Sequence, residues 1–275
     1  MSTETNCNHD CASCAEEDCK SRKIEKLKPH AETKIGKTIA VLSGKGGVGK
    51  TLVTSLLGAE LAKAGYKVAI MDADVTGPSI PQSFGVKGQA MGDENGIFAM
   101  KTKHDLRLMS VNCLLDNASD PVLWRGPLIA NLVSQLYTNV IYGKVDYFLI
   151  DMPPGTGDVP LTVFQQIPVD GVIVVASPQD LVSMIVEKAV NMCKMMKIPL
   201  LGLVENMAYV SCPHCGEKIR IYGEDKSQLV AKRYGIPLLD ELPIDPILAE
   251  ATDKGAIEEV EKSFLPGSVK AAEKL

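Results

Sequence analysis

The chain has 275 residues, of which 45 % are hydrophobic, and it carries a formal net charge of −5. This size and hydrophobic content suffice for one large α/β domain, whereas the negative charge argues against a nucleic-acid-binding protein that works by bulk electrostatics. The apolar runs are too short or too interrupted for a membrane span, and the polar N-terminus has no signal-peptide core. We therefore expect a cytoplasmic protein without nucleic-acid or membrane partners, whose cysteines are metal ligands or buried apolar residues rather than disulfides.

Short apolar runs alternate with helical patterns along most of the chain. Residues 1–34 are polar, charged and cysteine-rich, and we interpret them as a mobile tail; residues 35–275 are expected to form a single domain. The predicted strands are Thr38–Ser43, Lys67–Asp74, Leu106–Val111, Tyr147–Met152, Gly171–Ser177, Leu200–Asn206 and Pro237–Pro243. The predicted helices are Lys50–Ala64, Gly126–Tyr137, Gln179–Met196 and Lys226–Tyr234, with a weak amphipathic helix over Glu258–Leu275 that breaks at Pro266–Gly267. This alternation predicts an α/β fold with a mostly parallel central sheet and helices on both faces.

A phosphate-binding loop follows the first predicted strand. Gly44, Gly49, Lys50 and Thr51 match the pattern G-x-x-x-x-G-K-[ST], and the match lies between a strand and a helix. The glycines allow backbone N–H groups to converge on phosphate oxygens, at a helix N-terminus whose dipole favours anions. Lys50 is then expected to reach the β- and γ-phosphates, and the Thr51 hydroxyl to bind Mg²⁺. The alternative is a glycine-rich turn that binds nothing.

The loop contains a second lysine, Lys45, directly after its first glycine. The sequence KGGVGKT resembles the deviant Walker A loop of the MinD/ParA/nitrogenase-iron-protein class. The resemblance implies that Lys45 crosses a homodimer interface and supplies positive charge to the partner's nucleotide, so that phosphoryl transfer depends on dimerisation. It also implies that ATP contacts the whole loop, which comprises Gly44, Lys45, Gly46, Gly47, Val48, Gly49, Lys50 and Thr51. The alternative for Lys45 is an ordinary solvent-exposed loop lysine.

Further polar residues end hydrophobic strands at the edge where open α/β sheets bind ligands. In MDADVTGPS, Asp74 resembles the family's switch I aspartate, which orients the attacking water, whereas Asp72 is a candidate for a structural role. In YFLIDMPPGTGD, Asp151 is placed as a Walker B carboxylate near Mg²⁺, ahead of a switch II loop. Asn206, which closes LLGLVEN, matches the family's adenine-contacting asparagine, which favours ATP over GTP; the alternative is an ordinary turn residue.

Cys212 and Cys215 form a C-x-x-C pair in SCPHCGEKIRIYG. This spacing allows both thiolates to face one metal or cluster. Because only two cysteines occur here, four thiolate ligands require a second copy, which a symmetric dimer supplies. A cluster bridged between subunits is our main interpretation, with structural zinc and a redox pair as alternatives. We interpret His214 as a spacer, and Cys113 and Cys193, which lie in apolar segments, as buried thiols.

Four more cysteines, Cys7, Cys11, Cys14 and Cys19, lie in the tail. They suffice for one metal centre, and such a centre would be the main means by which the tail becomes ordered. The sequence leaves open whether they hold a cluster, hold zinc or form a redox-sensitive tail that binds nothing.

Several motifs recur together in one known family. GKGGVGKT, MDADVTGPS, LWRGP, DMPPGTGD, VENM and CPHC resemble the Mrp/ApbC/Nbp-type ATP-dependent iron–sulfur cluster carriers. The resemblance implies a homodimer that slowly hydrolyses ATP, holds a [4Fe–4S] cluster between its two C-x-x-C pairs and transfers it to apo iron–sulfur proteins. It assigns the catalytic roles to Lys45, Lys50, Asp74 and Asp151. The alternatives are a MinD/ParA-type positioning ATPase and a zinc-stabilised adaptor that binds ATP without turnover.

Overall fold

A computed structural model of the chain describes residues 25–75, 77, 79–115, 126–179, 184–223 and 226–275. The four cysteines of the tail and residues 123–125 of the LWRGP motif lie outside these residues. The described strands are β1 (Lys34–Ser43), β2 (Val68–Asp72), β3 (Gly92–Asp93), β4 (Gly96–Phe98), β5 (Met100–Lys101), β6 (Arg107–Met109), β7 (Val140–Ile141), β8 (Lys144–Asp151), β9 (Gly171–Ala176), β10 (Leu200–Ser211), β11 (Lys218–Ile219) and β12 (Leu238–Pro243). The described helices are α1 (Lys50–Lys63), α2 (Ile80–Ser83), α3 (Gly126–Thr138), α4 (Asp158–Gln166), α5 (Met184–Met195), α6 (Ser227–Tyr234), α7 (Pro246–Asp253) and α8 (Pro266–Glu273), with 3₁₀ turns at Val111–Leu114 and Ile257–Glu259.

A mostly parallel sheet forms the centre of the molecule, as the sequence predicts. Within the described residues its strand order is β11-β10-β9-β1-β8-β2-β6-β5, and β12 pairs with β10 off this path. The pairs from β10 through β6 are parallel, whereas β10/β11 and β5/β6 are antiparallel. A second small sheet, β3-β4-β7, was not predicted, because strands of two or three residues show no periodicity. The predicted α/β class is confirmed.

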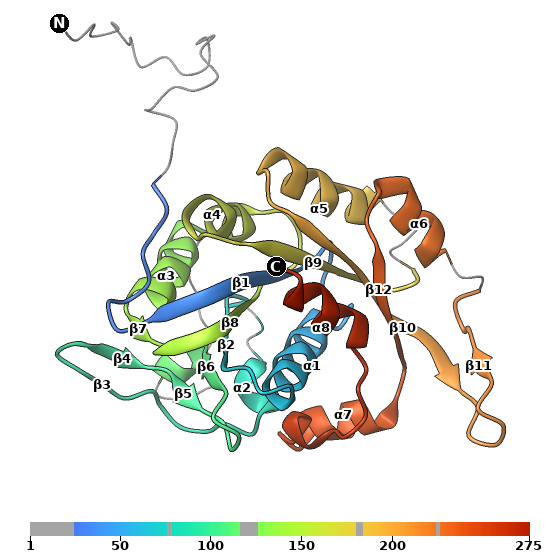
Figure 1. The fold of residues 1–275 in the computed structure, drawn as a ribbon, viewed down its shortest axis with the longest axis horizontal. Coiled ribbons are helices and arrows are strands. Elements are labelled where there is room, and N and C mark those ends of the chain that lie inside the picture. Colours follow the sequence, from blue (N-terminus) through green and yellow to red (C-terminus); the bar gives the residue numbers. More distant parts are fainter. Residues whose placement is uncertain (1–24, 76, 78, 116–125, 180–183, 224–225) are drawn as a thin grey trace, which may run out of the picture.

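The central strands are buried on both faces because helices cover both sides of the sheet. Every residue of β2 and β9 is buried, which explains their continuous apolar sequences. Figure 1 shows α1, α2, α7 and α8 grouped on one side of the sheet and α3, α4, α5 and α6 on the other, in agreement with the contacts between elements. The carboxyl ends of β1, β2 and β8 therefore meet at one edge, beside the first turn of α1.

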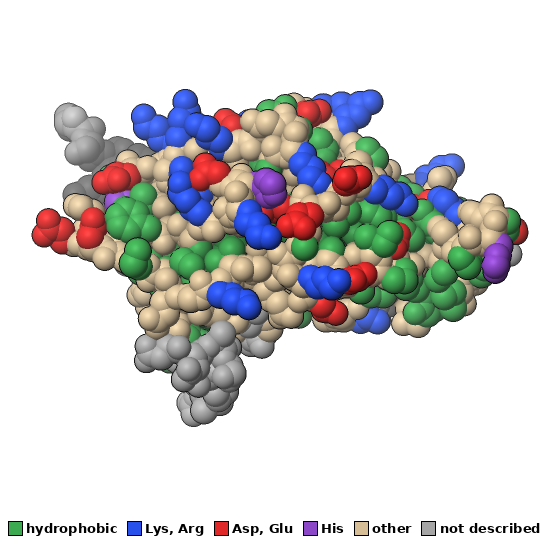
Figure 2. Space-filling view, turned by 90° about the horizontal axis from the view of Figure 1, so that it is seen from below, with side chains coloured by type: hydrophobic (Ala, Val, Ile, Leu, Met, Phe, Trp, Pro, Cys, Tyr) green, Lys and Arg blue, Asp and Glu red, His purple; other side chains and the backbone are tan. Residues whose placement is uncertain are grey.

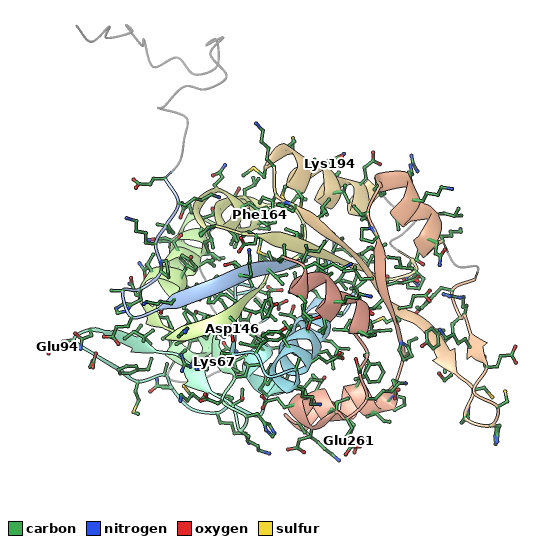
Figure 3. The ribbon with its side chains drawn as sticks, in the orientation of Figure 1. Lys67, Glu94, Asp146, Phe164, Lys194 and Glu261 are labelled. Atoms are coloured by element: carbon green, nitrogen blue, oxygen red, sulfur yellow. The ribbon has the colours of Figure 1, made fainter. Side chains whose placement is uncertain are left out.

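The register of β2 against β8 is fixed in part by a side chain. The Asp146 carboxylate accepts a hydrogen bond of 2.8 Å from the backbone N–H of Lys67, just before β2 begins (Figure 3). With this register, Val68 lies opposite Tyr147 and Asp72 lies opposite Asp151. Asp151, a predicted site residue, and Asp72, a candidate for a structural role, are thus brought to the same level of the sheet.

Several predicted boundaries were wrong. β10 runs on to Ser211, so the cysteine motif follows a strand directly. The predicted helix over Glu258–Leu275 is an α-helix only from Pro266, which occupies its first turn, where proline is favoured. The preceding segment instead crosses α1, where Glu60 accepts hydrogen bonds from the N–H groups of Phe264 and Leu265.

The last residues of the predicted tail contact the domain. The Lys26 ammonium donates to the carbonyl of Phe164, and the Leu27 N–H donates to the carbonyl of Gln166, at the end of α4. The division into residues 1–34 and 35–275 stays a prediction. Among the described residues, no helix is both long enough and apolar enough to cross a membrane.

Candidate nucleotide site and cysteine hairpin

The predicted phosphate-binding loop connects β1 to α1. Gly47 and Gly49 adopt φ values of 80° and 79°, a left-handed conformation that glycine adopts without strain. Gly49 has a second reason to be glycine, since a Cβ there would collide with the side-chain amide of Asn206. A cavity of about 250 Å³ opens at the loop and is lined by Gly46, Lys50 and Asp74, among others. The loop therefore presents backbone N–H groups and the N-terminus of α1 to a ligand in this cavity.

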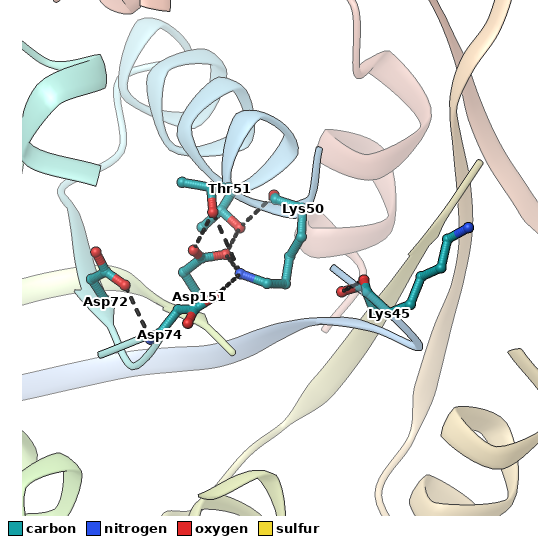
Figure 4. A network of polar contacts seen from close by, with 8 residues as sticks. Lys45, Lys50, Thr51, Asp72, Asp74 and Asp151 are labelled. Atoms are coloured by element: carbon teal, nitrogen blue, oxygen red, sulfur yellow. Dashed lines mark hydrogen bonds and ion pairs between the residues drawn. The ribbon is translucent and has the colours of Figure 1, made fainter. Parts of the chain in front are cut away.

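Lys50 lies between two of the predicted carboxylates (Figure 4). Its ammonium is 2.8 Å from Oδ1 of Asp151 and 3.7 Å from Oδ2 of Asp74. The Lys50 and Asp151 side chains are only 5 % and 1 % exposed, whereas that of Asp74 is 14 % exposed. Asp151 thus compensates a deeply buried lysine, and Asp74 reaches the mouth of the site.

Two threonines of α1 complete the environment of Asp151. The Thr51 hydroxyl donates to Oδ2 of Asp151, and the Thr54 hydroxyl donates to Oδ1, each over 2.7 Å. Sequence reasoning missed Thr54, although its spacing from Lys50 and Thr51 on a helix places the three residues on one face. The Thr51 hydroxyl and the Asp151 carboxylate are adjacent oxygen donors of the kind that Mg²⁺ binds, so these residues fit the predicted ion.

Asp72 differs from Asp74 in its surroundings. It is buried, and its Oδ1 accepts a hydrogen bond of 3.1 Å from the N–H of Asp74. Burial, reinforced by the negative charge of Asp151, raises the pKa of Asp72 well above its ordinary value. This environment suits a carboxyl group that holds the Asp74 backbone, whereas the more exposed Asp74 side chain faces the cavity.

Lys45 lies apart from this cluster. Its side chain is exposed and points away from Lys50 and Asp151 (Figure 4). The Ser43 hydroxyl donates to the Lys45 carbonyl over 3.0 Å, which fixes the backbone from which the lysine projects. The structure therefore places the two loop lysines in different environments, and the role of Lys45 across a dimer interface stays a prediction.

Asn206 contacts the loop directly. It is buried, and its Nδ2 donates over 2.9 Å to the carbonyl of Val48. Its predicted contact with adenine stays a prediction. The hydrogen bond to Val48 joins β10 to the phosphate-binding loop, a link between distant segments that the sequence alone does not reveal.

The C-x-x-C motif forms the tip of a hairpin that we call the cysteine hairpin (residues 210–219). β10 and β11 pair antiparallel at its base, and the Cys212 N–H donates to the Glu217 carbonyl over 2.9 Å. Cys212 is half-buried, and Cys215 is exposed. Backbone N–H groups of Cys215 and His214 directed at the Cys212 sulfur lower the pKa of that thiol.

The other described cysteines are buried. Cys113 and Cys193 lie in the core, as predicted, and burial raises the pKa of both thiols, that of Cys193 to about 12. Among the residues that the structure describes, no group of three or more His, Cys, Asp or Glu side chains is arranged to hold a metal ion. In the described part of one chain, the cysteine hairpin therefore offers half of a four-thiolate site.

A larger cavity lies away from these groups. It has a volume of about 560 Å³, between α1 and α8, and is lined by charges of both signs, including Lys63, Lys270 and Glu273. None of the predicted site residues lines it. We assign the nucleotide site to the smaller cavity because the glycine-rich backbone, the helix N-terminus and the buried lysine converge there.

Sequence comparison identifies the family. A sequence model of the ParA family, described as "NUBPL iron-transfer P-loop NTPase", matches residues 34–272. The chain belongs to this family. The described nucleotide site is consistent with a NUBPL-type P-loop NTPase, and the predicted resemblance is confirmed.

Named relatives and solved structures agree with this assignment. An iron–sulfur cluster carrier protein of Clostridium perfringens is 42 % identical over 267 residues, covering 90 % of this chain and 93 % of the relative. One from Methanocaldococcus jannaschii is 43 % identical over 225 residues, covering 81 % of this chain and 78 % of the relative. A nucleotide-binding protein from Archaeoglobus fulgidus, solved in complex with ADP and with cobalt found, has a TM-score of 0.76 at 44 % identity, covering 84 % of this chain and 90 % of that one. MinD of Aquifex aeolicus, in complex with MinC, shares the fold with a TM-score of 0.60 at 19 % identity, covering 87 % and 95 %.

Proposed function

We propose that this NUBPL-type P-loop NTPase is an ATP-dependent carrier of iron–sulfur clusters that works as a homodimer. The observation that carries the proposal is that one strand contacts the phosphate-binding loop and leads directly into the C-x-x-C pair. β10 holds Asn206 against Val48 and ends directly before Cys212. Relatives that carry the name iron–sulfur cluster carrier protein, at 42–43 % identity, support the same function. Because exposed thiols must stay reduced, we propose the cytoplasm as its compartment.

The nucleotide half is proposed to bind and slowly hydrolyse ATP. The loop backbone and Lys50 take the phosphates, and the Thr51 hydroxyl and Asp151 would hold Mg²⁺. When bound, that ion neutralises charge on the phosphate oxygens. Asp74, at the mouth of the cavity, orients the attacking water. Lys45, projecting outward, would reach the nucleotide of the partner and make turnover depend on pairing.

The cluster half is proposed to be built from two chains. One cysteine hairpin supplies two thiolates, and a [4Fe–4S] cluster needs four ligands. Figure 2 shows hydrophobic side chains gathered on the part of the surface that includes the β11 end of the molecule. Ile219, the last residue of the hairpin, is exposed, as are Ile221 and Tyr222 just after it. A second copy that covers this apolar surface would bring its own Cys212 and Cys215 to the same cluster.

A cluster held in this way is suited to transfer. Its ligands belong to two chains, so a shift of the interface loosens the cargo without unfolding either subunit. ATP binding and hydrolysis are proposed to produce that shift and thus control delivery to apo iron–sulfur proteins. The tail cysteines are proposed to hold a further centre, either a cluster or zinc.

Anaerobic reconstitution with iron and sulfide tests the proposal. Iron, sulfide and zinc are counted in the full chain, in Cys212→Ser/Cys215→Ser and in a variant with serine at the four tail cysteines. We expect the tail variant to hold about four iron atoms per two chains with the Mössbauer spectrum of a [4Fe–4S] cluster, and to activate an apo enzyme that needs such a cluster. The Cys212→Ser/Cys215→Ser variant should bind ATP and lose this activity. Zinc in place of iron at the hairpin would instead indicate an ATP-binding adaptor.

A further inference from the structure

β10 connects the nucleotide site to the cysteine hairpin within one chain. Asn206 holds the loop carbonyl of Val48, and the strand continues to Ser211, next to Cys212. A continuous strand therefore connects the residue that contacts the phosphate-binding loop to the backbone that begins the hairpin. The question is what makes the hairpin follow the strand.

The strand is irregular between the two sites. Glu205 is paired with Glu241 of β12, but the next paired residues are Tyr209 and Pro243, so β10 contains additional residues at this point. Met207 adopts a φ of 59°, a left-handed conformation that is strained for a residue with a side chain. A bulge bends its strand, so it sets the direction in which the hairpin leaves the sheet.

The cysteine hairpin itself has few attachments to the domain. Residues 213–219 are all exposed, and Lys218 stacks its ammonium 4.1 Å from the centre of the Tyr209 ring. Arg220 is the first residue after the hairpin that is not exposed, at 26 %. Arg220 therefore attaches the end of the hairpin to the domain, whereas Ile221 and Tyr222, which follow it, are exposed.

Arg220 lies beside two carboxylates, those of Glu205 and Glu241, at the point where the bulge begins. Its Nη2 is 2.9 Å from Oε1 of Glu241, and its Nη1 is 3.9 Å from Oε2 of Glu205. Glu205 is 1 % exposed, and the two glutamates are direct partners on neighbouring strands. Like charges at such positions repel each other, and the Arg220 guanidinium compensates both. One arginine thus joins the end of the hairpin to the residue next to Asn206.

We propose that Arg220 is a positioning residue that couples the nucleotide site to Cys212 and Cys215 through Glu205 and β10. It makes the cysteine hairpin move with the segment that holds the phosphate-binding loop. The inference rests on the proposed function, because it names the connection by which nucleotide would control the cluster thiols. It requires no contact with a second chain, so it can be measured on one chain with its cysteines free of metal.

The test measures how nucleotide alters the accessibility of the hairpin thiols. Iodoacetamide labelling of Cys212 and Cys215 in metal-free full-length protein is followed by peptide mass spectrometry, with and without saturating ADP or a non-hydrolysable ATP analogue. In the unmodified protein we expect nucleotide to change the labelling rate by about fivefold or more, the lower range for coupled sites. In Arg220→Gln the change should vanish while nucleotide affinity stays within about threefold.

Three further variants make the result specific. Arg220→Lys, which keeps the charge but not the forked geometry, should restore part of the nucleotide effect. Lys218→Gln removes a charge from the same hairpin without touching the two glutamates, and it should keep the full effect. Glu241→Gln, which removes the charge of the more exposed partner of Arg220, should reduce the change in labelling rate. If Arg220→Gln fails to fold, Glu241→Gln serves as the test of the coupling.

Three outcomes would overturn the inference. The first is that nucleotide changes the labelling rate in Arg220→Gln as much as in the unmodified protein. The second is that nucleotide does not change the labelling rate of the unmodified protein. The third is that the change disappears on dilution, because it then arises from the pairing of two chains. Iron binding is scored separately. If the protein binds no iron but nucleotide still changes the labelling rate, the proposed function is contradicted and the coupling is not. If the protein carries a cluster but nucleotide does not change the labelling rate, only the coupling is contradicted.

Discussion

The nucleotide site and the cysteine hairpin differ in how completely one chain builds them. Lys50, Thr51, Thr54 and Asp151 are held in a buried network in which each charge has its counterpart within the same chain. The cysteine hairpin, in contrast, is exposed and offers two sulfur ligands.

The difference indicates what each region is suited to do. Burial of Lys50 beside Asp151 orders the groups that bind phosphate before the ligand arrives, which lowers the entropic cost of binding. A pair of thiols, one half-buried and one exposed, that provides half of a ligand set is suited to accept and give up a cargo. Under the proposed function, the nucleotide site is permanent and the cysteine hairpin holds its cargo transiently.

The largest expected difference is in thiol reactivity. Burial raises the pKa of Cys193 to about 12, whereas backbone N–H groups lower that of Cys212 below its ordinary value of 9.0. At pH 7 the thiolate fraction of Cys212 should exceed that of Cys193 by at least about a thousandfold. Iodoacetamide labelling of metal-free protein, resolved by peptide, measures this. The Cys212 rate should level off at a lower pH than that of the same unfolded peptide. Equal labelling rates of Cys212 and Cys193 would contradict the predicted difference in thiolate fraction.

Lys50→Ala should weaken ATP binding by at least about 100-fold, because charged hydrogen bonds to two phosphates are lost. It also leaves Asp151 buried without its cation, so the melting temperature should fall. Isothermal titration calorimetry and thermal melts measure the two effects. An affinity within threefold of the original would show that the buried lysine is not the main phosphate ligand.

Asp74→Asn should lower the rate of ATP hydrolysis by up to about 100-fold, while ATP affinity changes little. The substitution keeps the size of the side chain but removes the charge that orients water. Asp105→Asn, at an exposed ion pair with Lys101, is the matched control. Normal turnover in Asp74→Asn would assign the positioning of water to another residue.

Lys45→Ala should have a smaller effect, about a tenfold loss of hydrolysis, because its ammonium is a single point charge, unlike the forked guanidinium of an arginine finger. Binding of ATP to the single chain should be preserved, since Lys45 lies apart from the Lys50 cluster. The hydrolysis rates of Lys45→Ala and the original protein are compared at concentrations at which the chains are single and at which they are paired. Hydrolysis at the original rate would mean that Lys45 does not act across an interface.

Much of the fold was predictable because each central strand contains a continuous apolar run. β2 and β9 are buried along their whole length, and their sequences show it. α4 and α7 were missed because each is short and has proline in its first turns, at Pro160 and Pro246, where a sequence pattern indicates a loop.

The candidate site was predictable only where a local motif defines it. Lys50 and Thr51 lie in one loop, and Asp151 ends an apolar strand, so each could be named in advance. The hydrogen bond of Asn206 to Val48 and the pairing of Arg220 with Glu205 and Glu241 depend on the packing of distant segments. No spacing along the chain indicates such contacts.

The most direct test of the account is the stoichiometry of the cluster at the cysteine hairpin. The variant with serine at the four tail cysteines is reconstituted anaerobically and examined by native mass spectrometry. The account predicts a species of two chains with one cluster of about four iron atoms, absent when Cys212 and Cys215 are also replaced by serine. One zinc ion per single chain, or a full complement of iron on a single chain, would contradict it.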